Sequence, residues 1–187
     1  MPLNTLGLAH AFVKAHVKAG DHVIDATAGR GHDTVFLGQL VGPAGHVLAM
    51  DIQPEAVAST KERVKAAGFE TFTQVVQDSH VNLADYAAPE SVDAILFNFG
   101  YLPGGDHSIF TKGETSIKAI EAGLGLLRSH GAMSLCIYHG GDTGYAERDA
   151  LLAYLRTIEP KVYTVLICPF YNRSGDPPIP VFILKET

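Results

Sequence analysis

Two glycines in a short turn, followed at a distance by an aspartate, are the residues best suited to hold a nucleoside cofactor. Gly29 and Gly31 come after an apolar run with a β-branched centre, which is typical of a buried parallel strand. Glycine lets the backbone turn sharply and approach a ligand where a Cβ would collide. Asp51 ends a second apolar run, about 20 residues beyond Gly31, a spacing at which a carboxylate can accept from both hydroxyls of a ribose. The pattern predicts a nucleoside-cofactor site.

The same turn also indicates which cofactor is bound. The dinucleotide fingerprint has a third glycine that leaves room for a pyrophosphate at a helix N-terminus. Here that glycine is missing, and an acid, Asp33, stands in this part of the turn. A carboxylate there would repel a pyrophosphate but tolerate a zwitterionic amino acid or a sulfonium. S-adenosylmethionine (SAM) is therefore the predicted cofactor in preference to NAD, and an ordinary turn is the alternative.

Residues that could position a substrate for methyl transfer follow two later apolar runs. The side-chain oxygen of Asn98 can accept from a substrate N–H and direct the nitrogen lone pair toward a methyl group, while Tyr101 can stack on a planar base. His139 is a candidate to receive the proton that the amine must lose, and a hydrogen bond to a neighbouring loop is its alternative role. These three residues form the predicted catalytic group.

The elements that must position these residues alternate between strand and helix. Strands are predicted at 22–26, 46–50, 71–76, 92–97 and 132–138, and helices at 33–40, 54–68, 114–127 and 145–158. A first helix runs from a cap at Asn4 or Thr5 to about residue 18. The last two strands, 162–169 and 179–184, have no helix between them and must pair antiparallel. The predicted fold is α/β: one domain, residues 1–187, with a three-layer, doubly wound, mostly parallel seven-stranded sheet. It is Rossmann-like, as in class I methyltransferases, and ends in an antiparallel β-hairpin.

Polar residues follow each of the five predicted parallel strands. Ligands of an open parallel sheet bind beyond the carboxyl ends of its strands, so these residues are expected to converge. Among them, Asp78 can accept from the exocyclic amine of adenine. A loop or helix cap is the alternative role of any one of them. The converging residues are 28–31, Asp51, Gln53, 78–80, 98–101, Tyr138 and His139.

Composition limits the classes of protein. The chain has 187 residues, of which 47% are hydrophobic and 18% charged, so one domain with a large core is expected. No apolar run is long enough to span a bilayer and no leader is recognised, which favours a cytoplasmic protein. The net charge of −6 argues against a strong, sequence-independent grip on nucleic acid. Five cations are nevertheless expected to form local patches on the loop-bearing face: Arg30, Lys112, Lys118, Arg128 and Arg173.

The two cysteines and three of the histidines are expected to have structural rather than functional roles. Cys136 and Cys168 lie in apolar runs and lack metal-ligand spacing, so they are expected to be buried free thiols, and no metal site is predicted. His10, His16 and His22 are interpreted as surface or structurally satisfied residues.

The chain resembles a family of small bacterial proteins, once labelled rRNA methylases, that act as SAM-dependent tRNA methyltransferases. The resemblance is carried by residues 15–21, 25–34, 51–53, 78–80, 98–106, 138–140 and 177–178, of which the Gly-Tyr-Leu-Pro-Gly-Gly-Asp segment at 100–106 is the most specific. Members of the family convert 5-aminomethyl-2-thiouridine at the wobble position of tRNA to 5-methylaminomethyl-2-thiouridine. The resemblance implies the same reaction here, with the anticodon region of tRNA as substrate.

The resemblance, together with the strand ends, assigns residues to two sites. The expected SAM-binding residues are Ala28, Gly29, Gly31, Asp33, Thr34, Asp51, Ile52, Gln53, Asp78, Ser79, His80 and Asn98. The expected substrate-binding residues are Tyr101, Pro103, Gly104, Gly105, Asp106, Tyr138, His139 and Asn172.

Three residues depart from the family pattern. Arg30 stands where the family usually has Asn, Gly141 replaces a second histidine, and His107 replaces a common lysine. The last two lie on the expected substrate side, so other functions stay open. These are methylation of a small-molecule amine or hydroxyl, methylation of rRNA, and a non-catalytic SAM-binding domain. Whether the chain forms a homodimer is also open.

Overall fold

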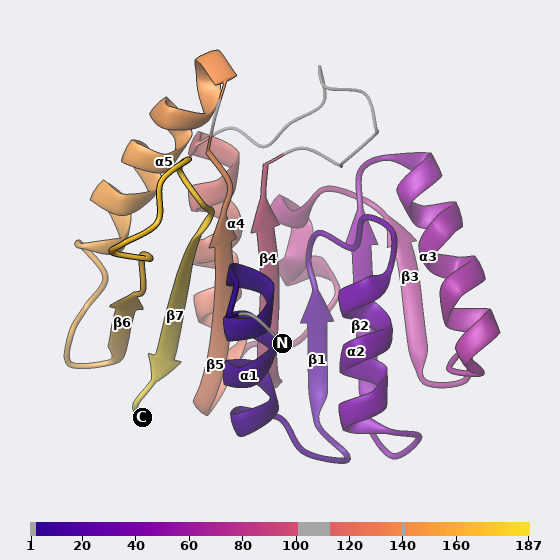
Figure 1. The fold of residues 1–187 in the computed structure, drawn as a ribbon. Coiled ribbons are helices and arrows are strands. Elements are labelled where there is room, and N and C mark those ends of the chain that lie inside the picture. Colours follow the sequence, from indigo (N-terminus) through magenta and orange to yellow (C-terminus); the bar gives the residue numbers. More distant parts are fainter. Residues whose placement is uncertain (1–2, 101–112, 140) are drawn as a thin grey trace.

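A central sheet with helices on both faces organises the chain (Figure 1). The computed structural model describes residues 3–100, 113–139 and 141–187. The strands lie side by side in the order β3-β2-β1-β4-β5-β7-β6. Their bounds are β1 His22–Asp25, β2 His46–Asp51, β3 Thr73–Gln77, β4 Val92–Phe99, β5 Leu127–Ile137, β6 Tyr163–Ile167 and β7 Ile179–Lys185.

Strand pairing confirms the predicted α/β class. β3, β2, β1, β4 and β5 are parallel neighbours. β7 lies between β5 and β6 and is antiparallel to both. The two last strands therefore pair as expected for strands without a helix between them, and the second of them also joins the parallel part of the sheet.

Helices cover both faces of the sheet. α1 (Thr5–His16), α2 (His32–Val41) and α3 (Pro54–Ala67) lie on one face, and α4 (Gly113–Leu126), α5 (Gly141–Leu155) and the short 3₁₀ helix η1 (His80–Asp85) lie on the other (Figure 1). Within the described ranges, no helix combines the length and the apolarity that a membrane span needs.

Local sequence signals explain where several helices begin and end. The Asn4 side chain caps α1 by accepting from the Gly7 N–H at 2.7 Å. Pro54 opens α3, where its missing N–H costs nothing, and Gly68 ends that helix at a φ of 74°. The observed bounds lie within a few residues of those predicted, apart from two differences. η1 was not predicted, and β5 begins at Leu127 rather than at residue 132 because Leu127 is buried and pairs with Val92 across a register shift.

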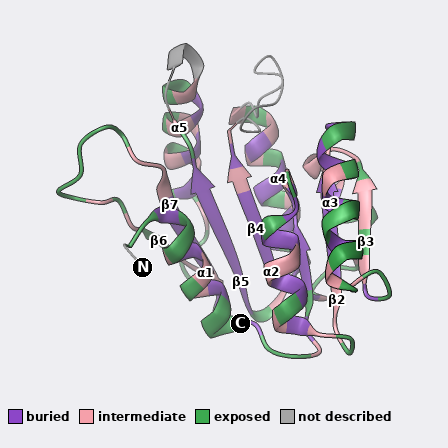
Figure 2. Cartoon of the chain, turned by 45° about the vertical axis from the view of Figure 1, so that its right-hand side comes forward, coloured by how far each residue is buried: buried purple, intermediate pink, exposed green. Residues whose placement is uncertain are grey.

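The central strands are largely buried (Figure 2). Alternation of side chains along them divides the core into two layers. Ile95, Phe97 and Phe99 belong to the cluster that packs on α4 and α5. Ala94 and Leu96 belong to the cluster that packs on α1 and α2. Asn98 therefore projects on the α1 side, while its two aromatic neighbours project on the α4 side.

Candidate active site

The glycine turn after β1 requires glycine at its second position. Gly29 and Gly31 have φ values of 53° and 78°, in the left-handed region. A Cβ on Gly31 would lie 2.9 Å from the Cα of Thr60 in α3, so the turn and this helix are in close contact. The Ala28 N–H donates to the Met50 carbonyl at 2.9 Å, which ties the turn to the end of β2. Glycine at this position therefore lets the turn pack directly against α3.

Asp51 is held by backbone donors at the end of β2. Its Oδ2 accepts from the Gly29 N–H at 2.9 Å and its Oδ1 from the Gln53 N–H at 3.0 Å, and Ile52 adds a further backbone hydrogen bond. A carboxylate has about four acceptor positions, so acceptor capacity remains for a ribose hydroxyl. Burial raises the pKa of Asp51, and the hydrogen bonds from Gln53 and Gly29 oppose that rise. Beside it, the Ile52 side chain is 57% exposed and offers an apolar surface to a flat ring.

Gln53, two residues after Asp51, has a side-chain oxygen without a partner among the described residues. The residue is buried, and among the described residues its Oε1 finds no hydrogen-bond partner. A buried amide oxygen without a partner is costly, and a ligand donor would satisfy it.

Asp25 lies beneath the glycine turn and was not among the residues expected to bind the cofactor. It is fully buried, and its Oδ2 accepts from the Thr34 hydroxyl at 2.6 Å. Burial, with a smaller contribution from the charge of Asp33, raises the pKa of Asp25 to about 7. The Thr34 hydroxyl is thereby committed to Asp25, so Thr34 as a direct cofactor contact stays a prediction. An acid at the end of an apolar strand, directly before a glycine turn, was the signal that could have indicated Asp25.

Asp33 joins three elements. Its Oδ1 accepts from His10 Nε2 of α1 at 2.7 Å, and its Oδ2 accepts from Asn98 Nδ2 at 2.9 Å. The Asn98 backbone N–H donates to the Thr27 hydroxyl at 2.7 Å. Two predicted site residues, Asp33 and Asn98, are therefore in direct contact, and both the backbone and the side chain of Asn98 are held.

The end of β3 lies beside the end of β2, because the Asp78 N–H donates to the Asp51 carbonyl at 3.1 Å. The Asp78 carboxylate accepts from Tyr86 Oη at 2.7 Å, Asn82 Nδ2 at 2.8 Å and its neighbour's backbone N–H. These hydrogen bonds, that from Tyr86 first, lower the pKa of Asp78 and keep it ionised. Its Oδ2 accepts from Tyr86 and can accept one more hydrogen bond, so binding of the adenine amine stays a prediction.

The two residues after Asp78, which were expected to bind the cofactor, have structural contacts of their own. Ser79 caps η1 by accepting from the Val81 N–H at 3.4 Å. His80 packs edge-on against Phe97 and Phe99, on the α4 side of the sheet and opposite to Asn98. Burial lowers the pKa of His80 to about 4, so the ring is neutral. Their roles in cofactor binding remain untested predictions.

Tyr138 and His139 leave β5 next to the end of β4. The Tyr138 N–H donates to the Phe99 carbonyl at 3.0 Å, and a Cβ on Gly100 would lie 3.0 Å from the Cβ of Tyr138. Tyr138 remains 40% exposed, and burial of the rest raises its pKa to about 12. His139 Nε2 lies 3.2 Å from the Pro177 carbonyl, so it carries the proton, and the buried Nδ1 has no partner among the described residues.

The β6–β7 connection forms the other wall of this region. Tyr145 of α5 donates to Asp176 at 2.7 Å, and the ring centroids of Tyr145 and His139 are 5.7 Å apart. Asn172 is exposed in this connection, and within the part of the chain that the structure describes no hydrogen bond ties it to the rest of the site. The expected substrate residues Tyr101, Pro103, Gly104, Gly105 and Asp106, with His107, lie outside the described residues.

The prediction that five cations lie on the loop-bearing face is wrong for Arg128. Arg128 lies near the amino end of β5, at the opposite edge of the sheet, where it forms an ion pair with Asp93. Lys118 pairs with Glu114 along α4 at 3.0 Å. Arg173 packs over the Phe170 ring, 3.9 Å from its centroid. Lys112 lies outside the described residues, and Arg30 adjoins the glycine turn, where its carbonyl accepts from Arg63 Nε at 2.8 Å.

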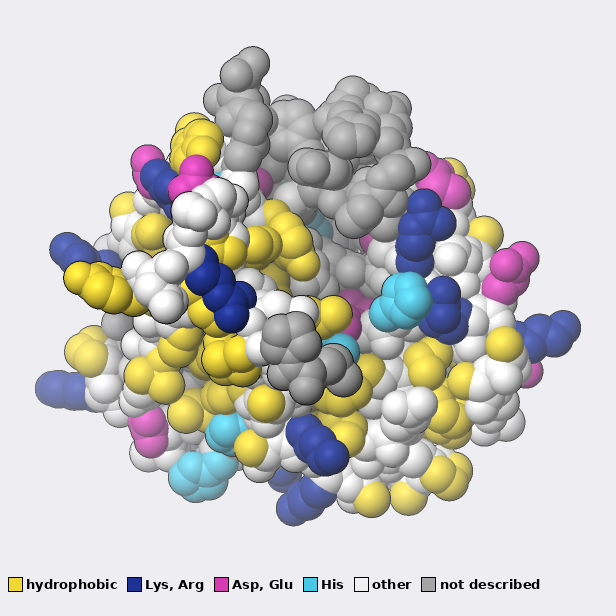
Figure 3. All heavy atoms as spheres, viewed as in Figure 1, with side chains coloured by type: hydrophobic (Ala, Val, Ile, Leu, Met, Phe, Trp, Pro, Cys, Tyr) yellow, Lys and Arg dark blue, Asp and Glu magenta, His cyan; other side chains and the backbone are white. Residues whose placement is uncertain are grey.

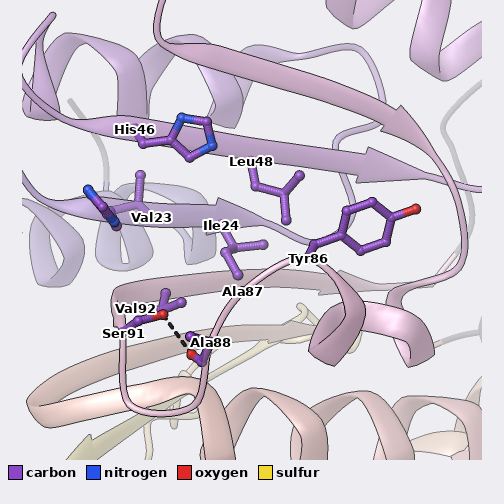
Figure 4. A pocket seen from close by; sticks show the side chains of 10 residues that line it. Val23, Ile24, His46, Leu48, Tyr86, Ala87, Ala88, Ser91 and Val92 are labelled. Atoms are coloured by element: carbon purple, nitrogen blue, oxygen red, sulfur yellow. Dashed lines mark hydrogen bonds between the residues drawn. The ribbon is translucent and has the colours of Figure 1, made fainter.

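A cavity of about 230 Å³ occurs elsewhere, between β1, β2 and the segment that precedes β4. Figure 4 shows His46, Leu48 and Tyr86 around it, with Ser91 donating to the Ala88 carbonyl at 2.6 Å. His22 and His46 begin their strands, so the cavity opens away from the carboxyl ends. None of the expected cofactor or substrate residues lines it.

The carboxyl edge of the sheet fits SAM. The left-handed glycines give backbone access, Asp51 has acceptor capacity left for ribose hydroxyls, and Gln53 has an unsatisfied oxygen. Asp33, which contacts Asn98, stays a predicted residue for the sulfonium and amino-acid part of SAM. Fold and site together define a class I SAM-dependent methyltransferase.

Comparison with known proteins identifies the family. Residues 47–184 match the family model described as "Putative rRNA methylase", and the chain belongs to this family. It is 34% identical over 191 residues to the chloroplastic tRNA (mnm(5)s(2)U34)-methyltransferase of Arabidopsis thaliana, covering 96% of this chain and 68% of the plant protein.

Two solved structures are similar over nearly the whole chain. A Clostridium thermocellum protein described as a putative rRNA-methylase has a TM-score of 0.96 and 40% identity, with 99% of both chains covered. A Streptococcus mutans protein described as a putative methyltransferase, in complex with S-adenosylhomocysteine (SAH), has a TM-score of 0.89 and 30% identity, again with 99% of both chains covered. The family, the predicted fold and SAM as cofactor are thereby confirmed.

Proposed function

We propose that this methyltransferase methylates the aminomethyl nitrogen of 5-aminomethyl-2-thiouridine at the wobble position of tRNA. The observation that carries the proposal is the fixed amide of Asn98 at the end of β4. Its Nδ2 donates to Asp33, so its Oδ1 is left as an acceptor for a substrate N–H. The similarity to a plant enzyme named for the same tRNA nucleoside supports the choice of substrate. The proposed location is the cytoplasm, and the proposed contact is the anticodon region.

The site residues would act mainly by positioning. Bound SAM supplies an electrophilic methyl group. The neutral amine attacks the methyl carbon in line with the breaking C–S bond, and SAH leaves as a neutral thioether. Asn98 orients the amine, and Tyr101 and Tyr138 frame the base.

His139 is the proposed acceptor of the proton that the methylated ammonium must lose. Its Nε2–H donates to the Pro177 carbonyl, so in the neutral ring the lone pair is on Nδ1. This Nδ1 is buried and has no partner among the residues described, so its lone pair is free to take up a proton.

A small-molecule amine is the second candidate substrate, because the net charge is −6. Lys and Arg side chains are spread over the face in Figure 3 rather than gathered in one patch. Ionic strength separates the two candidates, since methylation of tRNA weakens with added salt through counterion release, whereas methylation of a neutral metabolite does not.

The decisive experiment uses labelled SAM and bulk tRNA from cells that cannot complete wobble-uridine modification, followed by nucleoside mass spectrometry. We expect 5-methylaminomethyl-2-thiouridine to appear as its aminomethyl precursor disappears. SAM binding without any transfer to this tRNA would contradict the proposal and favour a small-molecule acceptor or a non-catalytic role.

A further inference from the structure

Three polar side chains from three elements form a continuous hydrogen-bonded chain beside the site. His10 of α1 contacts Asp33 of α2 at 2.7 Å, and Asp33 contacts Asn98 of β4 at 2.9 Å. The side chains of His10 and Asp33 are 29% and 11% exposed, so water competes little for the central carboxylate. The helix that carries His10 thus reaches the residue proposed to orient the amine.

The carboxylate determines which way the amide of Asn98 points. An ionised carboxylate can only accept hydrogen bonds, so the amide must present its NH₂ group to Asp33. Its Oδ1 then necessarily faces away from Asp33. The Asn98 backbone cannot rotate to compensate, because its N–H donates to the Thr27 hydroxyl at 2.7 Å and Asn98 pairs with Cys136 in β5.

His10 in turn holds the carboxylate. Its ring stacks on Phe36 of α2, with the centroids 3.9 Å apart and the planes inclined by 8°. Because the ring is fixed, its Nε2–H is directed at Asp33 Oδ1 and leaves Oδ2 for Asn98. Without this donor the nearly buried Oδ1 would lose its partner, and the carboxylate could turn to share both oxygens with Asn98.

We propose that His10 is a positioning residue for methyl transfer. Acting through Asp33, it keeps the Asn98 amide in the one orientation that offers Oδ1 to the acceptor nitrogen. This inference rests on the proposed function, in which Asn98 Oδ1 accepts from the substrate amine. Burial raises the pKa of both Cys136 and Tyr138, and the charge of Asp33 adds a smaller contribution to each, which is consistent with its closeness to the substrate side.

Two substitutions of His10 separate its donor from its ring. His10→Phe keeps the aromatic stack on Phe36 but removes the donor, and His10→Gln keeps a donor but removes the ring. His16→Phe is the matched control, since His16 is an exposed histidine of the same helix whose Nδ1 contacts the Phe12 carbonyl at 2.7 Å, within its own helix.

We expect His10→Phe to lower kcat on the aminomethyl-containing tRNA by about 10-fold, with the KM for SAM changed by less than about 3-fold. His10→Gln should retain at least about half of the wild-type kcat, and His16→Phe should behave as wild type. A wild-type kcat in His10→Phe would overturn the inference. So would a loss of SAH affinity in proportion to kcat, or no recovery in His10→Gln, because each indicates a merely structural role.

A second measurement is independent of the substrate. The side-chain amide protons of Asn98, assigned by their loss in Asn98→Asp, should shift and exchange faster with water in His10→Phe but not in His10→Gln. An unchanged Asn98 amide in His10→Phe overturns the inference even if the enzyme does not act on this tRNA. If the proposed function is wrong, the wild-type enzyme does not methylate this tRNA. That result is distinct from an unchanged Asn98 amide in His10→Phe, which concerns only the role of His10.

Discussion

The cofactor side and the substrate side of the site are held together in different ways. On the cofactor side, Gly29, Asp51, Gln53 and Thr60 all belong to one continuous stretch from β1 to α3, and backbone N–H groups fix the central carboxylate. On the substrate side, the contacts join distant parts of the chain, such as His139 with Pro177. A local sequence motif can specify the first arrangement, but the second exists only after remote elements have met.

Asn98→Ala is the variant with the largest expected effect, because it removes the side chain that is proposed to orient the acceptor amine. We expect kcat for methyl transfer to fall by about 100-fold or more, equivalent to about 3 kcal/mol in the activation free energy. SAH affinity, measured by calorimetry, should change by less than about 3-fold. If turnover and SAH binding fall together, Asn98 is a cofactor or folding residue and the proposed division of the site is wrong.

Gly31→Ala should break the cofactor side alone. The added Cβ combines a left-handed φ of 78° with a 2.9 Å approach to the Thr60 backbone, so the turn must move. We expect SAH affinity to fall by about 10-fold or more. Gly42→Ala is the control, because Gly42 has a φ of 62° but a Cβ there would meet nothing within 4 Å. Equal SAH affinities in the two variants would show that the close approach is unimportant.

Asp25→Asn should change how stability depends on pH. The pKa of Asp25 rises from its ordinary value of 3.8 to about 7 on folding, so the folded protein binds more protons than the unfolded chain between these values. Its contribution to the free energy of unfolding is therefore favourable at low pH and is lost as pH rises toward 7, by on the order of 2–4 kcal/mol.

Urea unfolding of both proteins from pH 4 to pH 8 measures this contribution. The pH-dependent part assigned to Asp25 should be absent from Asp25→Asn, while Asp85→Asn, at an exposed position, should leave the wild-type slope in place. The same slope in Asp25→Asn as in wild type would mean that Asp25 is ionised in the folded protein.

Asn172→Ala should have the smallest effect on activity. It tests whether the β6–β7 connection contacts the substrate. Its side chain is exposed, so thermal stability and SAH affinity should not change. A rise of about 3-fold in the KM for tRNA is expected if it contacts the substrate. Ser174→Ala, in the same connection, is the control, and a KM equal to wild type in Asn172→Ala would remove Asn172 from the substrate site.

The sequence predicted the sheet and the cofactor turn because their signals are local. Apolar runs, a capping Asn4, Pro54 and the glycines each determine the structure of the few residues around them. The strand β7 was predicted, but its insertion between β5 and β6 was not, since pairing partners are not encoded by adjacent residues. η1 was missed because its residues carry no helical apolar repeat.

The same limit explains which site residues were missed. Asp25 is an ordinary acid in the sequence, and only its burial beside Asp33 raises its pKa. His10 was interpreted as a surface or satisfied histidine. It does have a partner, but that partner is Asp33 in the next helix, and the contact depends on α1 lying across β5 and β7. No spacing within α1 indicates it.

The docking of α1 has a consequence for the order of folding. α1 packs against β7 through the stacked rings of Phe12 and Phe182, 4.2 Å apart, and Thr5 donates to the Pro178 carbonyl at 2.7 Å. These contacts join residues some 170 positions apart, so they form only once β7 has been made and inserted. α1 also packs against β5 and shares a buried cluster with β1, β4 and α2, so β7 supplies one part of its docking. A chain that still lacks β7 can build the glycine turn, but the helix that carries His10 then lacks the packing that Phe182 and Pro178 supply.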